Sequence, residues 1–236
     1  HLLSDKPIAV FAGHEEAVIG NNERSDESCC ADHLEQQLFP VEAWGSEYIA
    51  ALSPDRGNHE DHWRVVSAED NNVVTFDPPQ NGASQVTLNR GEVTAFYSTD
   101  SFEIRATGKL SVGQFLTSAG QTDDGIGDPA FILAVPQSQY RADYHVLTPT
   151  GYTRDYVTVI RPAGAAITID SAPVADGEFA PVGSGNWEVA TVQVQPGVHI
   201  IEGGEPFGLQ AYGFNNAVSY GYPGGLNLVG VDEEAP

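Results

Sequence analysis

Apolar residues occur along the chain in short runs, many of them alternating with polar residues, and long stretches with a 3.6-residue period are nearly absent. The runs are rich in valine, isoleucine, threonine and aromatic residues, which favour strands. The 25 glycines and 15 prolines are scattered between the runs and indicate many turns. The pattern predicts an all-β protein with strands at Pro7–Phe11, Glu47–Leu52, Trp63–Ser67, Val73–Phe76, Val86–Leu88, Lys109–Phe115, Tyr156–Ile160, Ala166–Ile169, Trp187–Val194 and Pro206–Phe214.

One segment has the pattern of a short helix. Asp32 is suited to an N-cap and Glu35 follows three residues later, as in a capping box. Leu34 and Leu38 share one face at helical spacing. We therefore expect one short helix near residues 32–38.

The chain also contains an internal repeat, because blocks of residues recur in the same order about 100 residues apart. The longest block, Pro40–Ala50, recurs as Pro136–Val146. The other matches are Trp63–Val66 and Val74–Asp77 with Tyr156–Val159 and Ile167–Asp170, Leu88–Gly91 with Val194–Gly197, and Lys109–Val112 with Pro206–Leu209. Each match is short, but their common order indicates a duplication.

A repeat of about 100 residues with several short strands has the size of a β-sandwich. We predict two tandem β-sandwich-like modules, at residues 40–118 and 119–236. The alternative is one continuous sandwich whose halves are related by a pseudo-twofold axis. Residues 1–39 are expected to supply the closing strand of a preceding unit, a loop and the short helix, because Pro7–Val10 is a third copy of the last block.

The run Pro7–Phe11 lacks the strands that precede its counterparts, so other parts of the protein must bury it. We expect residues 1–13 to pack against the first module, because this arrangement orders no second molecule. The alternative is addition of this strand to a sheet of a neighbouring molecule, which gives a filament when it is repeated in one direction.

The charge of the chain narrows the range of partners. There are 33 acidic and 10 basic residues, so the formal net charge is −23. Such a surface repels phosphate backbones and anionic headgroups, and we expect no nucleic-acid partner. Apolar stretches are no longer than Phe131–Val135, which is too short for membrane insertion. The chain lacks methionine and opens on His1, so we expect a processed or excised piece of a longer protein.

Asp123, Asp124 and Asp128 form the best candidate metal site. Three carboxylates close in sequence, with glycines that bend the backbone, suit an oxygen-seeking cation such as calcium. The spacing does not match an EF-hand, and a solvated acidic loop is the alternative. We expect no other cofactor.

The histidines are weaker metal candidates. His59 and His62 lack a third ligand at a defined position, so a hydrated turn before Trp63 is the preferred interpretation. For His14 and His33 the alternatives are a shared zinc site and, preferred, buried histidines bonded to the backbone.

Catalytic motifs are missing from the sequence. There is no Gly-x-Ser-x-Gly elbow, no His-Glu-x-x-His pair and no glycine-rich phosphate loop before a long helix. We predict that the protein is not an enzyme.

Several segments carry a family likeness: Asp5–His14, Cys30–Leu38, Trp44–Gly45, Arg64–Asp70, Gly127–Ala130 and Ser219–Gly225. Together they resemble the N-terminal domain family of the IgGFc-binding protein of mucus, including its bacterial homologues. The resemblance spans nearly the whole chain. It implies an extracellular, non-catalytic, adhesive or mucin-associated module.

The cysteines depart from that family. Family members usually have a cysteine two residues after the Gly-His pair, and Glu16 occupies this position here. The two cysteines of the chain are the adjacent Cys29 and Cys30. Adjacent Cα atoms are about 3.8 Å apart, so a disulfide between them is strained but feasible. We predict this vicinal disulfide, with free thiols or an intermolecular bridge as alternatives.

These observations predict an extracellular adhesion, binding or structural module of a larger secreted or cell-surface protein, acting through the faces and edges of its sandwiches. The expected ligand is a protein or a glycan. Tyr220 and Tyr222 are the contact candidates, whereas Tyr212 and Phe214 are expected in the core. The alternatives are a β-fold carbohydrate-active enzyme and a subunit of an extracellular filament with head-to-tail self-association.

Overall fold

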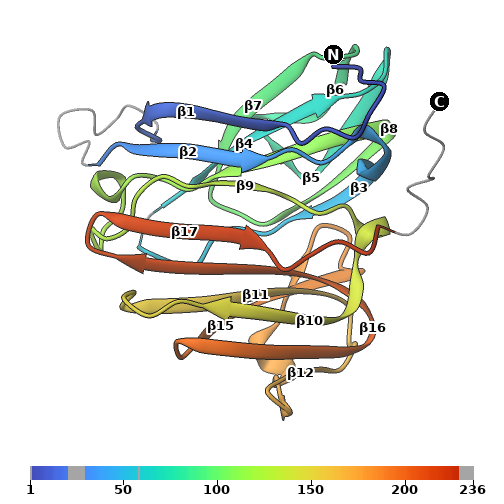
Figure 1. Cartoon of the computed structure of the whole chain (residues 1–236). Helices are drawn as coiled ribbons and strands as arrows, with labels where there is room; N and C mark the ends of the chain where they lie inside the picture. Colours follow the sequence, from blue (N-terminus) through green and yellow to red (C-terminus); the bar gives the residue numbers. More distant parts are fainter. Residues whose placement is uncertain (1, 21–29, 58, 229–236) are drawn as a thin grey trace.

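The computed structural model describes residues 2–20, 30–57 and 59–228. Its regular structure is β, as predicted, apart from short 3₁₀ turns (Figure 1). The strands are β1 Phe11–Ala17, β2 Asp32–Gln37, β3 Gly45–Ala50, β4 Asp61–Ser67, β5 Asn72–Gln80, β6 Ala83–Leu88, β7 Val93–Ser98, β8 Phe102–Phe115, β9 Phe131–Leu133, β10 Arg141–Thr148, β11 Arg154–Pro162, β12 Ile167–Ile169, β13 Ala172–Pro173, β14 Ala180–Val182, β15 Trp187–Val194, β16 Gly197–Asn215 and β17 Val218–Pro223. The 3₁₀ turns are η2 Val41–Ala43, η3 Ala119–Gln121, η4 Gln137–Gln139 and η5 Asp176–Glu178.

The first sheet has seven strands in the order β6-β5-β8-β4-β7, with β3 and β9 also paired to β8. The long strand β8 organises this sheet, because its two halves have different neighbours. Its first half, residues 102–106, pairs with β3 and β5, and its second half, residues 110–115, pairs with β4 and β9. The change occurs around Gly108, where a Cβ atom would lie 2.7 Å from the carboxyl carbon of Glu69. The sheet curls into a sandwich whose core includes Trp63, Phe102 and Val112.

The second sheet has eight strands and the same connectivity. Its order β13-β12-β16-β11-β15 repeats the order β6-β5-β8-β4-β7, and β14 extends it. Strand β16 takes the place of β8, with β10 and β12 on its first half and β11 and β17 on its second half. The structure therefore confirms the duplication and the two sandwich-like modules, called here the first module (β3–β9) and the second module (β10–β17). Strand β9 belongs to the first sheet although its residues lie beyond residue 118.

The two modules repeat one buried hydrogen-bond arrangement at their first strands. The hydroxyl of Tyr48 donates to Leu110 O at 2.5 Å and accepts from Gly45 N at 3.1 Å. In the second module the hydroxyl of Tyr144 donates to the carbonyl of Phe207 at 2.5 Å, and it accepts from Arg141 N, the first amide of its own strand β10, at 2.9 Å. These tyrosines fasten the first strand of each module to its long strand, as the match of Pro40–Ala50 with Pro136–Val146 indicated.

The pairing corrects two details of the predicted repeat. Trp63 corresponds to Val157 and not to Tyr156. Trp63 pairs with Gln114, four residues after Leu110, and Val157 pairs with Ala211, four residues after Phe207. The match of Leu88–Gly91 with Val194–Gly197 was wrong: the first follows β6, whereas the second follows β15. Both segments are tight turns after a strand, and turn residues are similar wherever a strand ends.

The predicted helix at 32–38 was wrong. Residues 32–37 form strand β2, which pairs antiparallel with β1 so that His14 lies opposite Leu34. Pairing with a distant segment overrides a helix signal of only two turns. The predicted strand Pro7–Phe11 was also displaced, because β1 begins at Phe11.

The hairpin β1–β2 packs on the first module through Leu34, which is buried with Ile19 against Phe115. The expected burial of residues 1–13 did not occur at the predicted run, since Ile8 and Phe11 are each 57% exposed. Packing in this region uses the second strand of the hairpin and leaves apolar side chains of the first segment in solvent.

The two modules are in direct contact, and β9 lies beside β17 (Figure 1). Leu116 and Ile132 of the first module are fully buried against Tyr212 and Phe214 of the second. Tyr212 and Phe214 were predicted to be core residues, and both are fully buried. The modules therefore share a core as well as a linker.

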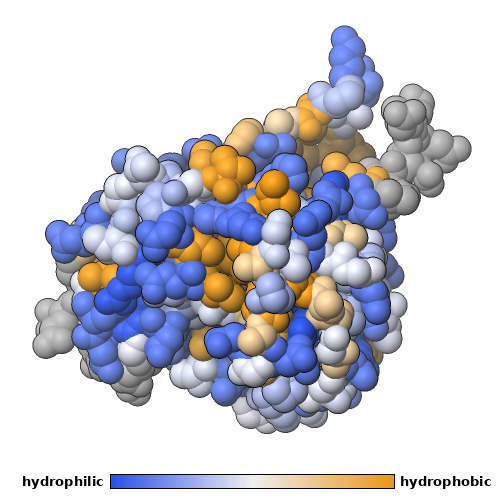
Figure 2. Space-filling view, turned by 90° about the horizontal axis from the view of Figure 1, so that it is seen from below, coloured by the Kyte–Doolittle hydropathy of each residue, from blue (hydrophilic) through white to orange (hydrophobic). Residues whose placement is uncertain are grey.

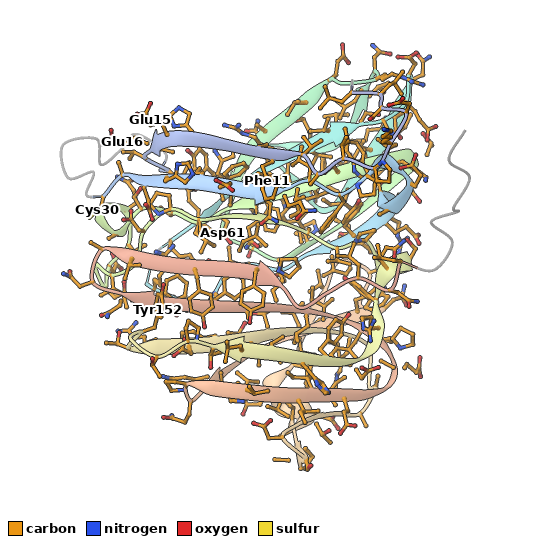
Figure 3. All side chains as sticks on the ribbon, viewed as in Figure 1. Phe11, Glu15, Glu16, Cys30, Asp61 and Tyr152 are labelled. Atoms are coloured by element: carbon orange, nitrogen blue, oxygen red, sulfur yellow. The ribbon has the colours of Figure 1, made fainter. Side chains whose placement is uncertain are left out.

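A chain of buried polar groups crosses this interface at Asp61 (Figure 3). The Asp61 carboxylate accepts from Gln114 Nε2 at 2.6 Å and from Ser53 N at 2.8 Å. Gln114 Oε1 in turn accepts from Tyr212 OH at 3.0 Å and from Gln210 Nε2 at 3.3 Å. Buried polar groups are tolerated when they are bonded in this way, so the network aligns the two modules.

Candidate functional site

The second module contains an open groove of about 670 Å³ between β12–β13, η5 and the end of β15. This volume lies in the usual range for ligand sites, roughly 300–1,000 Å³. Apolar side chains line it, and polar side chains surround them on this face of the molecule (Figure 2). The apolar lining includes Ile169, Val174, Val192 and Val194, and the polar lining includes Asp170, Glu178, Thr191, Gln193, Gln195 and His199.

The groove exists because the second module lacks aromatic side chains that fill the same place in the first module. There, Phe76, Phe96 and Phe102 contact one another with ring centroids 5.3–6.2 Å apart, and Trp63 lies 5.3 Å from Phe102. Strand pairing shows the corresponding residues: Ile169 for Phe76, Val192 for Phe96, His199 for Phe102 and Val157 for Trp63. Each replacement is smaller, and three of the four line the groove.

His199 closes one end of the groove through two hydrogen bonds. Its Nδ1 lies 2.7 Å from Asp170 Oδ2, and its Nε2 lies 2.7 Å from the carbonyl oxygen of Gln195. Thr148 Oγ1 lies 3.3 Å from the same Nε2, so both ring nitrogens have hydrogen-bond partners. The bond from His199, followed by the bond from Ile200 N, lowers the pKa of Asp170. With both nitrogens bonded, the ring of His199 is held in one orientation at the end of the groove.

The three aspartates predicted to bind calcium have separate environments. Asp124 Oδ2 accepts from Arg154 Nη1 at 2.6 Å, and its Oδ1 accepts from Ile126 N at 3.1 Å. Asp123 donates its backbone N–H to the carbonyl of Gly57. Asp128 is buried, and burial raises its pKa to about 6. Among the described residues there is no group of three or more histidines, cysteines, aspartates and glutamates that could hold a metal ion. The calcium site stays a prediction.

His59 and His62 lie in packed surroundings, whereas His14 and His33 are exposed. His59 is buried, with Nε2 at 3.3 Å from the hydroxyl of Ser53, so the predicted hydrated turn was wrong. His62 lies edge-on to Tyr97, and burial lowers its pKa to about 4. His14 shares the face of its partner Leu34 and is exposed, so the neighbouring His33 points to the opposite face. The preferred interpretation of His14 and His33 as buried histidines was therefore wrong, because both are exposed. Their positions on opposite faces also do not support a zinc site between them.

The contact candidates Tyr220 and Tyr222 lie half-buried on β17. Tyr220 OH donates to Asp155 Oδ1 at 2.6 Å, and Tyr222 OH donates to Leu147 O at 2.7 Å. Tyr152 meets Tyr220 edge-on at 4.7 Å, and Tyr220 and Tyr222 stack at 5.9 Å. The hydroxyls of Tyr220 and Tyr222 are therefore held by hydrogen bonds, and the rings of Tyr152, Tyr220 and Tyr222 contact one another in sequence.

The predicted Cys29–Cys30 disulfide lies outside the described residues, because Cys29 is not among them. In the part of the chain that the structure describes, no helix is long and apolar enough to cross a membrane.

Sequence reasoning missed the groove. Its apolar residues occupy ordinary strand positions in the sequence. Whether they enclose a groove depends on the size of the side chains that face them across the sandwich. One signal was present, since Phe76 and Ile169 already correspond in the matched blocks Val74–Asp77 and Ile167–Asp170. A systematic comparison of aromatic residues between the two copies would have shown the difference.

A duplicated β-sandwich fold with an open groove in its second module places the chain in the class of all-β modular proteins. The model of the IgGFc binding protein family matches residues 1–213, so the chain belongs to this family. This membership supports an extracellular binding module. No curated protein and no solved structure matches the chain.

Proposed function

We propose that the protein is a non-catalytic, extracellular adhesion module that binds a protein ligand in the groove of the second module. The observation that carries the proposal is the difference between the modules. Where three mutually packed phenylalanines close the first sandwich, the second leaves an apolar groove of about 670 Å³. Family membership supports a protein as the ligand.

The lining of the groove indicates the type of segment that fits. The apolar floor suits one or two apolar side chains of an extended segment. Asp170 and Glu178 lie at the rim, and the chain as a whole carries a net charge of −23. We therefore expect a ligand segment whose apolar residues are flanked by lysine or arginine, with association that weakens as salt screens the charges.

The test is a binding measurement with two probes, the Fc fragment of immunoglobulin G and a mucin glycoprotein, on immobilised full chain. Val192→Phe restores the ring that the first module has at this position and fills the groove. Val198→Phe is the matched control, because Val198 is 67% exposed and is not part of the groove lining.

We expect Val192→Phe to weaken binding at least about tenfold, equivalent to about 1.4 kcal/mol, and Val198→Phe to leave it unchanged. Asp170→Asn and Glu178→Gln should reduce the salt dependence. Unchanged binding by Val192→Phe, or the absence of binding to both probes, contradicts the proposal.

A further inference from the structure

The chain carries the same hairpin three times. Strand β1 pairs with β2 as the second half of β8 pairs with β9 and as the second half of β16 pairs with β17. The matching cross-strand pairs are Phe11 with Gln37, Gly113 with Leu133, and Gln210 with Pro223. In the first two hairpins the paired residue of the second strand lies three positions before a proline, Pro40 or Pro136, that starts a 3₁₀ turn and the next module. The hairpin β1–β2 thus occupies the place of the last hairpin of a preceding unit.

Each hairpin contacts the following unit in the same way. Phe115 of the first module packs on Leu34 of the hairpin before it, and Tyr212 of the second module packs on Ile132 of the hairpin before it. Phe115 and Tyr212 are equivalent, because they pair with His62 and Tyr156 at the same place in β4 and β11. Consequently β2 lies against β9, and β9 lies against β17 (Figure 1). The inner face of one hairpin contacts the outer face of the next unit, which is a heterologous contact.

Among the residues that the structure describes, no unit is stacked on the inner face of the hairpin formed by β16 and β17. In the first module this face carries Gln114 and Ile132, and the second module buries both completely. In the second module the same face carries Ala211 and Tyr222. The half-buried rings of Tyr152, Tyr220 and Tyr222, here called the tyrosine face, lie at this position.

The complementary surface lies at the other end of the chain. Phe11 occupies the position of Gln210, the residue that contacts Gln114 of the preceding unit. Phe11 is 57% exposed on the hairpin β1–β2, far from Tyr152 beside β17 (Figure 3). An exposed phenylalanine is thus available at the position that, in the second module, makes contact with the unit before it.

We propose that the tyrosine face binds the β1–β2 hairpin of a second copy of this chain, through Phe11, so that copies assemble head to tail. The contact continues the interface that already joins β2 to β9 and β9 to β17. It uses the same operation for each added copy, so the product is an open chain of molecules unless the rotation closes a ring. The inference is independent of the groove, because the groove lies between β12 and β15 and the tyrosine face on β17.

Charge opposes this association at low salt. Each copy carries a net charge of −23, and Glu15 and Glu16 lie on β1 of the hairpin that docks (Figure 3). Added salt screens such repulsion. Assembly is therefore expected to increase with ionic strength, opposite to the salt dependence expected for a basic ligand in the groove.

The experiment blocks each surface separately in the full chain and follows mass by sedimentation velocity at low and high salt. Phe11→Glu blocks the hairpin, and Tyr152→Glu blocks the tyrosine face without removing the hydroxyls of Tyr220 and Tyr222. Val93→Glu is the control, because Val93 is 52% exposed and belongs to neither surface. Circular dichroism and thermal unfolding verify that each variant folds.

The wild-type chain and Val93→Glu are expected to form chains at high salt, and each blocked variant alone is expected to stay monomeric. An equal mixture of Phe11→Glu and Tyr152→Glu should give a discrete dimer, because one open surface remains on each variant. A wild-type protein that stays monomeric at all salt concentrations overturns the proposal. So do chains formed by a single blocked variant, or a mixture that stays monomeric while the wild type assembles.

Discussion

Replacement of Gln114 by leucine is expected to destabilise the whole chain, because this one side chain joins polar groups of both modules. Gln114 is fully buried and donates to the Asp61 carboxylate at 2.6 Å and to Ala51 O at 3.1 Å. It also accepts from Tyr212 OH at 3.0 Å. Leucine is similar in size, so the change removes hydrogen bonds without opening a large cavity.

The magnitude follows from the groups that lose a partner. A hydrogen bond to a charged group contributes about 1.5–3 kcal/mol, and a buried carbonyl left with one partner fewer costs about 1 kcal/mol. Tyr212 keeps its second bond, to Gln210 Oε1 at 2.8 Å, so its loss is smaller. We expect Gln114→Leu to lower the free energy of unfolding by about 3–5 kcal/mol.

The assay is urea unfolding of the full chain, followed by circular dichroism and tryptophan fluorescence. Gln85→Leu is the control, because Gln85 is an exposed glutamine of β6, and its effect should stay within about 0.5 kcal/mol. A double-mutant cycle with Tyr212→Phe should give a coupling energy of about 0.5–1.5 kcal/mol. A loss below about 1 kcal/mol together with zero coupling would refute the reasoning, since the network would then not connect the modules.

Three further predictions test single side chains. Burial raises the pKa of Asp128 to about 6, so the folded chain binds this proton more tightly than the unfolded chain and stability falls as pH rises from about 4 to about 6. Asp128→Asn should remove that slope and add up to about 3 kcal/mol at pH 8, measured by urea unfolding over a pH series. Tyr222→Phe removes a hydroxyl that bonds both the carbonyl and the amide of Leu147, and should cost about 1 kcal/mol in thermal unfolding. Arg161→Met leaves Glu188 without its 2.8 Å ion pair and should cost about 2–4 kcal/mol in urea unfolding; a neutral result would show that packing of the methionine compensates.

The sequence predicts the repeat and most strands because both depend on local signals. Period-two apolar runs and turn residues mark strands whatever their partners are, and Pro40–Ala50 and Pro136–Val146 keep the tyrosine that fastens the first strand. It does not predict β2, because the capping pattern at Asp32 is local whereas the pairing with β1 depends on a distant segment. The shift of one residue at Trp63 has the same origin, since pairing register is set across the sheet.

The functional surfaces are less predictable for a physical reason. The calcium prediction at Asp123, Asp124 and Asp128 used carboxylate spacing alone. That spacing does not show that Arg154 contacts Asp124 from a strand that follows 30 residues later. The groove arises because the second module has smaller side chains where the first module has phenylalanines. The effect of a smaller side chain on packing can be judged only when its neighbours in space are known. Tyr220 and Tyr222 were predicted as contact residues from their place among glycines near the end of the chain, and the structure places both half-buried on β17, so their role as contacts stays a prediction.

The shared interface also sets an order of events during protein synthesis. The first module is complete when Leu133 has been made, but the residues that cover its end, Tyr212 and Phe214, follow about 80 residues later. At a synthesis rate of about 5–20 residues per second, Gln114 and Ile132 remain without these partners for roughly 4–16 s. A nascent chain that is interrupted in this interval exposes to water the groups that the complete chain buries here. These groups are the polar network of Asp61 and Gln114 and the apolar side chains of Leu116 and Ile132. The second module therefore covers this surface of the first module only after its own last strands have been synthesised.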